Sequence, residues 1–327
     1  MKTLNFEKLG KNTISFYLAL EEYLLSTFSC DFFFLWDLYP AVVIGKHQLI
    51  DAEVNLPFVK EKNIKVYRRN SGGGAIYADE GCFMFTFITR NDNKEFVFKR
   101  YLQKIIDALK KLNIEAVFSG RNDLLIESKK FSGNSMYLGN NGTILHGTFL
   151  YNTDLDDLEK FITPDKLKIT SKGIKSVRER VINVKNFTNL SKEELMNFLE
   201  KEIGQDLFNL STDDLEKVNE LKKKYDSDEW IYGANPKASI EFEKRFSWGN
   251  LRLALNVNKN IITEVNFYGD FIPIKDLDGL KKHLINQKYH HLLDKIIPIS
   301  EYILNAADED FKILLGGKTN DQENNSL

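Results

Sequence analysis

The feature that most constrains this chain is a run of three glycines, Gly72–Gly74, which follows Arg68 and Arg69 after two intervening residues. Because glycine has no Cβ atom, the backbone there can adopt positive φ and bring its N–H groups against a bound group. The two guanidinium groups offer paired donors that suit carboxylate or phosphate oxygens. We interpret the stretch as an anion-binding loop; a flexible turn between two strands is the alternative. It is neither a Walker loop, which needs a following Gly-Lys-Ser/Thr, nor a dinucleotide fingerprint.

Length and composition limit the class of protein. With 327 residues, 43% of them hydrophobic, the chain can form one large or two ordinary domains, and we expect two. A formal net charge of −2 gives no electrostatic footprint for nucleic acid. The longest apolar runs, such as Phe32–Trp36, are too short to span a membrane, and no charged-then-apolar leader opens the chain. Two cysteines do not make a disulfide framework. We expect a cytoplasmic monomer that binds neither nucleic acid nor membranes.

The hydrophobic pattern of the first half alternates irregularly between helices and strands. Apolar residues recur at helical spacing after Asn12 and again over residues 95–112, and each stretch predicts an amphipathic helix. Apolar runs rich in β-branched and aromatic residues predict strands. The predicted strands are residues 31–38, 41–45, 82–89, 115–118, 123–127 and 142–151. This order predicts an α+β fold with a mixed β-sheet flanked by helices, rather than a regular βαβ repeat.

The pattern changes in the last third of the chain. Ser191 and Glu194 have capping-box spacing ahead of a helix. Farther on, alternating leucines, a polar turn and a second strand predict a small α+β unit. We therefore predict a large domain, a small C-terminal accessory domain and a polar, disordered tail. Their predicted ranges are residues 1–244, 245–315 and 316–327.

Several polar residues are candidates for chemistry, and each alone also has an ordinary interpretation. Asn122 and Asp123 open a predicted strand, where such residues usually serve a turn. Lys130 precedes Ser-Gly, and a lone lysine is usually solvated. Glu21 falls close to the apolar face of the first helix, which predicts either a carboxylate with a buried partner or a partly exposed edge position. His47 follows a strand and is typical of a surface or structural histidine.

Taken together, these residues resemble the lipoate-protein ligase family. Residues 68–77, Arg-Arg-Asn-Ser-Gly-Gly-Gly-Ala-Ile-Tyr, resemble its Arg-Arg-x-Ser-Gly-Gly-Gly-Ala signature. Residues 120–124 resemble its Gly-Arg-Asn-Asp-Leu element, and residues 130–133 its Lys-x-Ser-Gly element. The basic residues 171–184 resemble the segment that closes over the acyl adenylate, and residues 229–270 the entry to the accessory domain. The motifs occur in the family's order over nearly the whole chain.

The resemblance implies a biotin/lipoate ligase-like fold and a two-step, ATP-dependent ligase. Lipoate would attack the α-phosphate of ATP to give lipoyl-AMP, and a lysine of an apo acceptor would then take the lipoyl group as an amide. The implied acceptors are lipoyl domains of 2-oxoacid dehydrogenase acyltransferase subunits or the glycine-cleavage H protein. The large domain would be the catalytic, lipoate- and ATP-binding one.

The resemblance also assigns roles to individual residues. Lys130 would bridge the acyl carbonyl and the α-phosphate as a catalytic point charge. Asn122 and Asp123 would hold Mg²⁺ or polarise the acceptor lysine, with Asp123 as the catalytic residue and the metal ligand; oxygen ligands suit this metal. Binding of the nucleotide and lipoate would fall to Arg69, Ser71, Gly73, Gly74, Ala75, Ile76, Tyr77, Asn122 and Lys130. The apolar strands near Val42 and Phe85 would wall the lipoate tail, or simply be core.

Three departures from the family pattern leave rivals open. Ser135 stands where alanine is usual, Leu145 replaces the first of two histidines, and Cys82 takes the place of a common asparagine. Related octanoyltransferases carry the acyl group on a thiolate, although a thiol among phenylalanines is usually inert. The rivals are therefore a cysteine-dependent octanoyl or lipoyl acyltransferase, a biotin-protein ligase, and a silent lipoate-binding protein.

Overall fold

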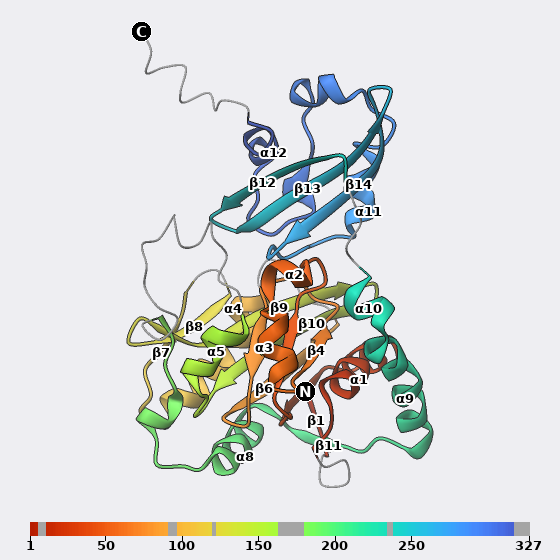
Figure 1. The fold of residues 1–327 in the computed structure, drawn as a ribbon. Coiled ribbons are helices and arrows are strands. Elements are labelled where there is room, and N and C mark those ends of the chain that lie inside the picture. Colours follow the sequence, from red (N-terminus) through yellow and green to blue (C-terminus); the bar gives the residue numbers. More distant parts are fainter. Residues whose placement is uncertain (6–10, 91–96, 120–121, 163–179, 234–237, 317–327) are drawn as a thin grey trace.

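A computed structural model describes residues 1–5, 11–90, 97–119, 122–162, 180–233 and 238–316 of the chain. Figure 1 shows a larger body built on strands β1–β11 and a smaller one built on β12–β14. Most of residues 171–184, which resemble the segment that closes over the acyl adenylate, lie outside the described residues. The predicted tail lies almost entirely outside them. None of the helices within those ranges is long and apolar enough to cross a membrane.

The larger body is organised around an eight-stranded mixed sheet. Its β1 pairs in parallel with β2 and β11, and the other neighbours are antiparallel. The strands, in spatial order, are β11 (Asp206–Phe208), β1 (Lys2–Leu4), β2 (Phe32–Trp36), β6 (Cys82–Thr89), β10 (Gly142–Leu150), β9 (Lys129–Gly139), β8 (Asp123–Ile126) and β7 (Ala116–Phe118). This arrangement confirms the predicted α+β class with a mixed sheet.

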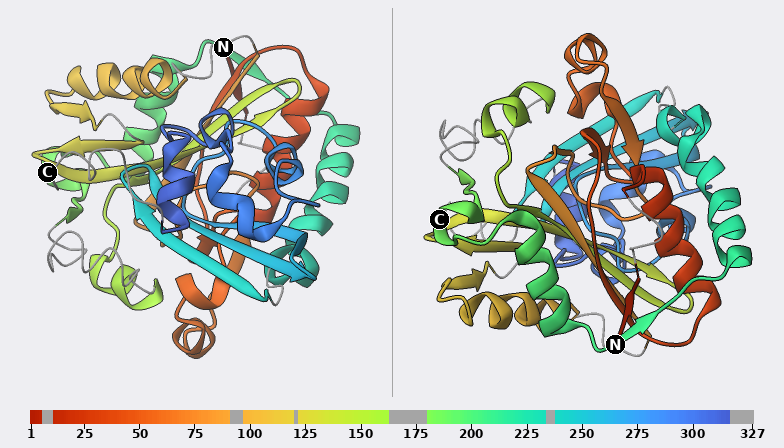
Figure 2. Two further views of the ribbon diagram at one scale, coloured as in Figure 1. Left: turned by 90° about the horizontal axis from the view of Figure 1, so that it is seen from above. Right: turned by 90° about the horizontal axis from the view of Figure 1, so that it is seen from below.

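Helices cover both faces of this sheet, which explains why its central strands are apolar throughout. Every residue of β2 and β6 is buried. Since side chains alternate across a strand, Phe33 packs in one core with α4 (Val97–Lys110) and α8 (Lys192–Ile203), whereas Phe34 packs in the other with α1 (Ile14–Thr27) and α9 (Thr212–Asp226). Helices α1 and α9 lie side by side along one flank (Figure 2).

The glycine-rich stretch is carried by a separate three-stranded sheet. Strand β3 (Ala41–Ile44) lies between β4 (Lys65–Arg68), to which it is parallel, and β5 (Ile76–Ala78), to which it is antiparallel. The loop that joins β4 to β5, residues 69–75, is called the glycine loop below. Short helices cover this sheet: α2 (Ile50–Glu53), α3 (Leu56–Glu61), α5 (Leu155–Phe161) and α10 (Asp228–Tyr232).

The smaller body has its own core. Its antiparallel strands are β12 (Ile240–Phe246), β13 (Gly249–Asn258) and β14 (Ile261–Gly269). They pack against α11 (Leu277–Lys282), α12 (Glu309–Leu314) and the 3-10 turns η3 (Tyr289–Asp294) and η4 (Ile299–Glu301). A further 3-10 turn, η2 (Val184–Phe187), belongs to the larger body. The predicted boundary at residue 244 falls inside β12, so we place the division before Ile240.

Candidate active site

Arg69 shapes the glycine loop from within. Its side chain is buried, at 6% exposure, and all three guanidinium nitrogens donate to the loop or to β3. Nη2 donates to the carbonyls of Gly72 at 2.6 Å and Gly74 at 2.8 Å, and Nε donates to Ser71 Oγ at 3.0 Å. Burial lowers the pKa of Arg69 to about 10, so it stays charged at neutral pH. A direct contact from Arg69 to a nucleotide stays a prediction.

Arg68 ties the start of the loop to the end of the larger body. Its Nε and Nη2 donate to the carbonyl of Ile231 in α10, at 3.0 and 2.7 Å. Nη1 donates to the carbonyls of Gly45, Lys46 and Gln48. Burial lowers the pKa of Arg68, too, to about 10. The paired arginines therefore hold backbone carbonyls, which fixes the loop's path.

Close backbone approach explains two of the glycines. A Cβ on Gly45 would lie 2.3 Å from the carbonyl oxygen of Gly73, and Gly73 itself has φ of +85°. Gly74, Ala75 and Ile76 are partly exposed. The Tyr77 side chain is buried and its ring stacks on Phe161 at 4.2 Å. Residues 74–76 are thus the partly exposed part of the predicted binding stretch.

A buried hydrogen-bond relay supports the loop from below. Ser71 Oγ lies 2.6 Å from Nε2 of His146 on β10, and Nδ1 of His146 donates to the Glu21 carboxylate at 2.9 Å. Thr86 Oγ1 also donates to Glu21, and Trp36 Nε1 donates to Thr86 at 3.0 Å. The predicted buried partner of Glu21 is thereby confirmed. His146 was missed by sequence reasoning, because a single histidine in an apolar strand gives no signal of its partners.

Lys130 and Asp123 form the second half of the site. Lys130 Nζ lies 2.7 Å from Asp123 Oδ1, and both side chains are about one third exposed, at 37% and 31%. A Cβ on Gly133 would lie 2.6 Å from Lys130 Nζ, so the end of the lysine side chain lies over that glycine, three residues farther along β9. In this conformation Gly133 leaves room for the lysine ammonium.

Asn122 has a mainly structural set of bonds. Its Nδ2 donates to the carbonyl of Asn134 at 2.7 Å, and Asn134 Nδ2 donates back to the carbonyl of Asn122 at 2.8 Å. Gly147 makes room for this pair, because a Cβ there would lie 2.0 Å from Asn134 Oδ1. The reciprocal bonds hold the start of β8 on β9 and so place the adjoining Asp123.

Magnesium would find only part of its coordination shell in the described protein residues. Within those ranges, no group of three or more His, Cys, Asp or Glu could hold a metal ion. Asp123 offers one partly exposed carboxylate, beside the Lys130 ammonium. Mg²⁺ is commonly held by one or two carboxylates, waters and substrate phosphates. The residues present fit that mode and do not fit an all-protein metal centre.

Strand β9 joins the two halves of the site. Ser135 Oγ donates to the carbonyl of Gly72 in the glycine loop at 2.7 Å. Gly133, which lies under the Lys130 ammonium, is two residues away along the same strand, roughly 7 Å at the usual rise. The structure thus brings Lys130 and Asp123 to the loop side of β9. Ser135 was not predicted as a site residue, although it was noted as a departure from the family pattern.

The smaller body also touches the glycine loop. Gly73 N donates to the carbonyl of Phe271 at 3.0 Å, and Gly269 N donates to the carbonyl of His47 at 3.0 Å. The rings of His47 and Phe271 stack at 5.4 Å. A Cβ on Gly72 would lie 2.4 Å from the Phe271 carbonyl oxygen. The loop therefore lies at the interface between the two bodies.

Cys82 is not placed for thiol chemistry. It is fully buried at the start of β6. Burial raises the pKa of the thiol to about 12, so the thiolate is scarce at neutral pH. This favours the inert interpretation of Cys82.

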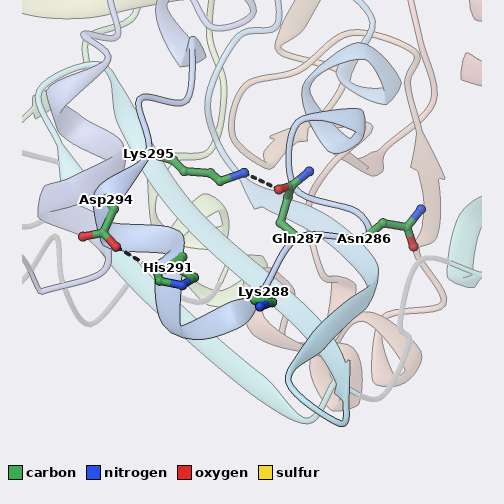
Figure 3. A pocket seen from close by; sticks show the side chains of 6 residues that line it. All are labelled: Asn286, Gln287, Lys288, His291, Asp294 and Lys295. Carbon is green, nitrogen blue, oxygen red and sulfur yellow. Dashed lines mark hydrogen bonds and ion pairs between the residues drawn. The ribbon is translucent and has the colours of Figure 1, made fainter.

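One hollow of about 540 Å³ lies elsewhere, in the smaller body (Figure 3). Among its lining residues, His291 and Asp294 of η3 pair at 3.0 Å, and Lys295 donates to Gln287. Its other lining residues are Asn286 and Lys288. None of the motif residues lines it, so it does not belong to the site.

Comparison with known proteins shows which family the chain belongs to. The family model of the lipoyl protein ligase A/B catalytic domain matches residues 13–204, and that of the bacterial lipoate protein ligase C-terminus matches residues 235–315. Lipoate–protein ligase 1 of Staphylococcus aureus is 35% identical over 316 residues, which cover 93% of this chain and 95% of that protein. The chain belongs to the lipoate-protein ligase family.

Solved structures agree with this assignment. P. falciparum LipL1, in complex with lipoate, superposes with a TM-score of 0.74 and 29% identity over 88% of this chain and 90% of that chain. The bipartite lipoate protein ligase from Thermoplasma acidophilum, described with its E2 lipoyl domain, gives a TM-score of 0.63 and 26% identity over 73% of this chain and 98% of that one. These matches confirm the predicted ligase fold.

Proposed function

We propose that this ligase uses ATP to convert lipoate to lipoyl-AMP, and then transfers the lipoyl group to a lysine of an apo lipoyl domain. The observation that supports it most is the meeting of two motifs: β9 connects the Lys130–Asp123 pair to the glycine loop through Ser135. Family membership and the relatives' names point to the same activity.

In the first step a lipoate carboxylate oxygen forms a bond to the α-phosphorus of ATP, and the bond to the leaving pyrophosphate breaks. Negative charge accumulates at the phosphoryl and acyl oxygens. We assign to Lys130 the stabilisation of this charge, since its ammonium is partly exposed and is held in position by the ion pair with Asp123. The backbone at 74–76 would contact the nucleotide from a loop that Arg69 holds rigid.

In the second step the acceptor lysine's neutral amine attacks the acyl carbonyl, AMP leaves, and the amine loses a proton. Asp123 is the carboxylate nearest Lys130 that could orient this amine. When bound, Mg²⁺ would neutralise phosphate charge, and Asp123 is the residue that would hold it. No protein nucleophile takes part, in keeping with the buried Cys82.

The acceptor is proposed to be a lipoyl domain of a 2-oxoacid dehydrogenase acyltransferase subunit or a glycine-cleavage H protein. The protein, ATP, Mg²⁺, lipoate and an apo lipoyl domain are incubated together, and the domain is weighed by mass spectrometry. A mass gain of one lipoyl group that requires ATP supports the proposal. An unchanged mass with a lipoyl domain and with an H protein contradicts it.

Three measurements separate the rival activities. A thiol acyltransferase would lose transfer on Cys82→Ser, whereas the ligase keeps it. A biotin-protein ligase would show biotin-dependent ATP–pyrophosphate exchange in competition with lipoate. A silent lipoate-binding protein would bind lipoate and release no pyrophosphate.

A further inference from the structure

Helix α1 carries two adjacent glutamates, and both reach the glycine loop by different routes. Glu21 does so through His146 and Ser71, as described above. Glu22 instead faces α9 and contacts Asn70. Asn70 occupies the one variable position inside the Arg-Arg-x-Ser signature, so the motif itself assigns it no role.

Three donors converge on one oxygen of Glu22. Asn70 Nδ2 and Lys224 Nζ each donate to Glu22 Oε2 at 2.9 Å, and the hydroxyl of Tyr225 donates to the same atom. Asn70 Nδ2 also donates to the Tyr225 hydroxyl oxygen. Burial opposes the charge on Glu22, yet these hydrogen bonds and the Lys224 charge leave its pKa below the ordinary value. We call Glu22, Asn70 and Tyr225 the tyrosine junction.

The junction joins three parts of the chain through a buried tyrosine. Tyr225 is 1% exposed and its ring meets Trp230 edge to face at 5.8 Å. Trp230 Nε1 donates to the carbonyl of Arg68 at 2.7 Å. Residues 68 and 70, on either side of Arg69, are therefore both fastened to the corner between α9 and α10.

We propose that Tyr225 is a positioning residue for ATP, acting through Asn70 on the glycine loop. The proposal rests on the proposed function of that loop. Its hydroxyl is shared between the Asn70 amide and the Glu22 carboxylate, so removing it leaves the amide with a less defined position. Because Asn70 directly precedes Ser71, a shift of Asn70 moves the loop backbone on which the nucleotide is proposed to lie.

Tyr23 provides a matched control. Its hydroxyl also joins α1 to α9, by donating to Asp214 at 2.6 Å, but neither residue contacts the loop in the bonds described. Tyr23→Phe and Tyr225→Phe therefore each remove one hydroxyl–carboxylate bond between the same two helices. A purely structural role for Tyr225 would make the two variants alike.

The test compares these variants by lipoate-dependent ATP–pyrophosphate exchange and by thermal unfolding. Tyr225→Phe is expected to lower kcat/KM for ATP by about 10-fold, since small misplacements of binding groups are costly. Tyr23→Phe is expected to keep the parent value. Asn70→Ala should match Tyr225→Phe, and the double variant should lose no more than either, because the two residues act as a unit. Equal kinetics for the two tyrosine variants, or additive losses for Asn70→Ala and Tyr225→Phe, would overturn the proposal.

A separate measurement keeps this test independent of the overall function. The affinity for ATP is determined by isothermal titration calorimetry for the parent, Tyr23→Phe and Tyr225→Phe proteins. If the parent shows no exchange with lipoate, the proposed function fails, but weaker ATP binding by Tyr225→Phe alone still supports the positioning role. Unchanged ATP affinity together with unchanged exchange refutes it.

Discussion

The two halves of the candidate active site are built in opposite ways. In the glycine loop, Arg69 is 6% exposed and its guanidinium nitrogens all donate to neighbouring oxygens. Across β9, Lys130 and Asp123 are about one third exposed and meet in a single ion pair. The loop is therefore a fixed frame, whereas the pair consists of charges that can exchange partners.

This contrast separates two kinds of motif residue. A buried arginine whose donors are used by the protein contributes mainly to the folded structure. A partly exposed lysine, whose ion pair contributes little to stability, is free to serve the reaction. Substitutions of the Lys130–Asp123 pair should therefore lower activity without lowering stability. Substitutions in the glycine loop should lower both.

The largest effect on activity is expected for Lys130→Ala. Removing the ammonium takes away the charge that we propose stabilises the adenylation step, and comparable losses of one stabilising donor cost about 100- to 1,000-fold in rate. The free energy of unfolding, measured by urea titration, should stay within about 0.5 kcal/mol of the parent value, as for other surface substitutions. Adenylate formation is measured as ATP–pyrophosphate exchange.

Lys129→Ala is the control for this change, because Lys129 is the exposed neighbour on the same strand. It should leave exchange at the parent rate. Lipoyl-AMP formed by Lys130→Ala at the parent rate would show that the assigned role is wrong.

The largest effect on stability is expected for Arg69→Met. It would leave buried carbonyls of the glycine loop without donors, at a cost of about 3 kcal/mol in the free energy of unfolding. Arg252→Met is the comparison, since the ion pair of Arg252 with Glu241 is partly exposed and its loss should change stability by less than about 1 kcal/mol. Urea titration gives both values. If Arg69→Met were as stable as Arg252→Met, the loop would not depend on the guanidinium.

The same contrast explains how much the sequence alone could predict. Strand β6 matches the predicted residues 82–89, because an apolar, aromatic run is typical of a buried strand. The capping box at Ser191 and Glu194 is confirmed at the start of α8. Local patterns of this kind need no knowledge of distant residues.

Strand β9 was missed as an element because Lys129–Lys130 and the Ser-Gly-Asn-Ser that follows have poor strand propensity. It forms because distant groups satisfy it: Asn122 bonds Asn134, and the hydroxyl of Ser135 reaches the glycine loop. The groups that accept hydrogen bonds from Arg69, and the partners of His146, could not be predicted for the same reason. Their partners are set by tertiary packing rather than by neighbours in the sequence.

Glycine substitutions test the fixed frame sterically. Gly45→Ala would place a Cβ 2.3 Å from the carbonyl oxygen of Gly73, a backbone atom that must shift. We expect a loss of about 2 kcal/mol, within the range for overpacking. In Gly74→Ala the nearest atom that the Cβ would meet is Asp270 Cβ at 4.0 Å, so stability should fall far less. Equal unfolding midpoints for the two variants would mean that the loop yields easily.

The smallest effect is expected from pH, at the interface between the two bodies. His47 stacks on Phe271, and burial together with the charges of Lys46, Lys281 and Arg68 lowers its pKa from 6.5 to about 3. Below pH 6.5 the unfolded chain therefore binds a proton that the folded chain does not yet bind. Stability contributed by neutral His47 is complete above that pH and decreases as the pH falls toward 3.

Because His47 is partly exposed, the effect should be discounted to about 1 kcal/mol between neutral pH and about pH 5. His47→Gln removes the titrating group, so the free energy of unfolding of this variant should fall less over the same pH interval than that of the parent. Urea titrations at both pH values measure the difference. If parent and variant lost the same free energy of unfolding over this pH interval, His47 would be protonated in the folded protein. Its ring would then not stay buried against Phe271 in mild acid.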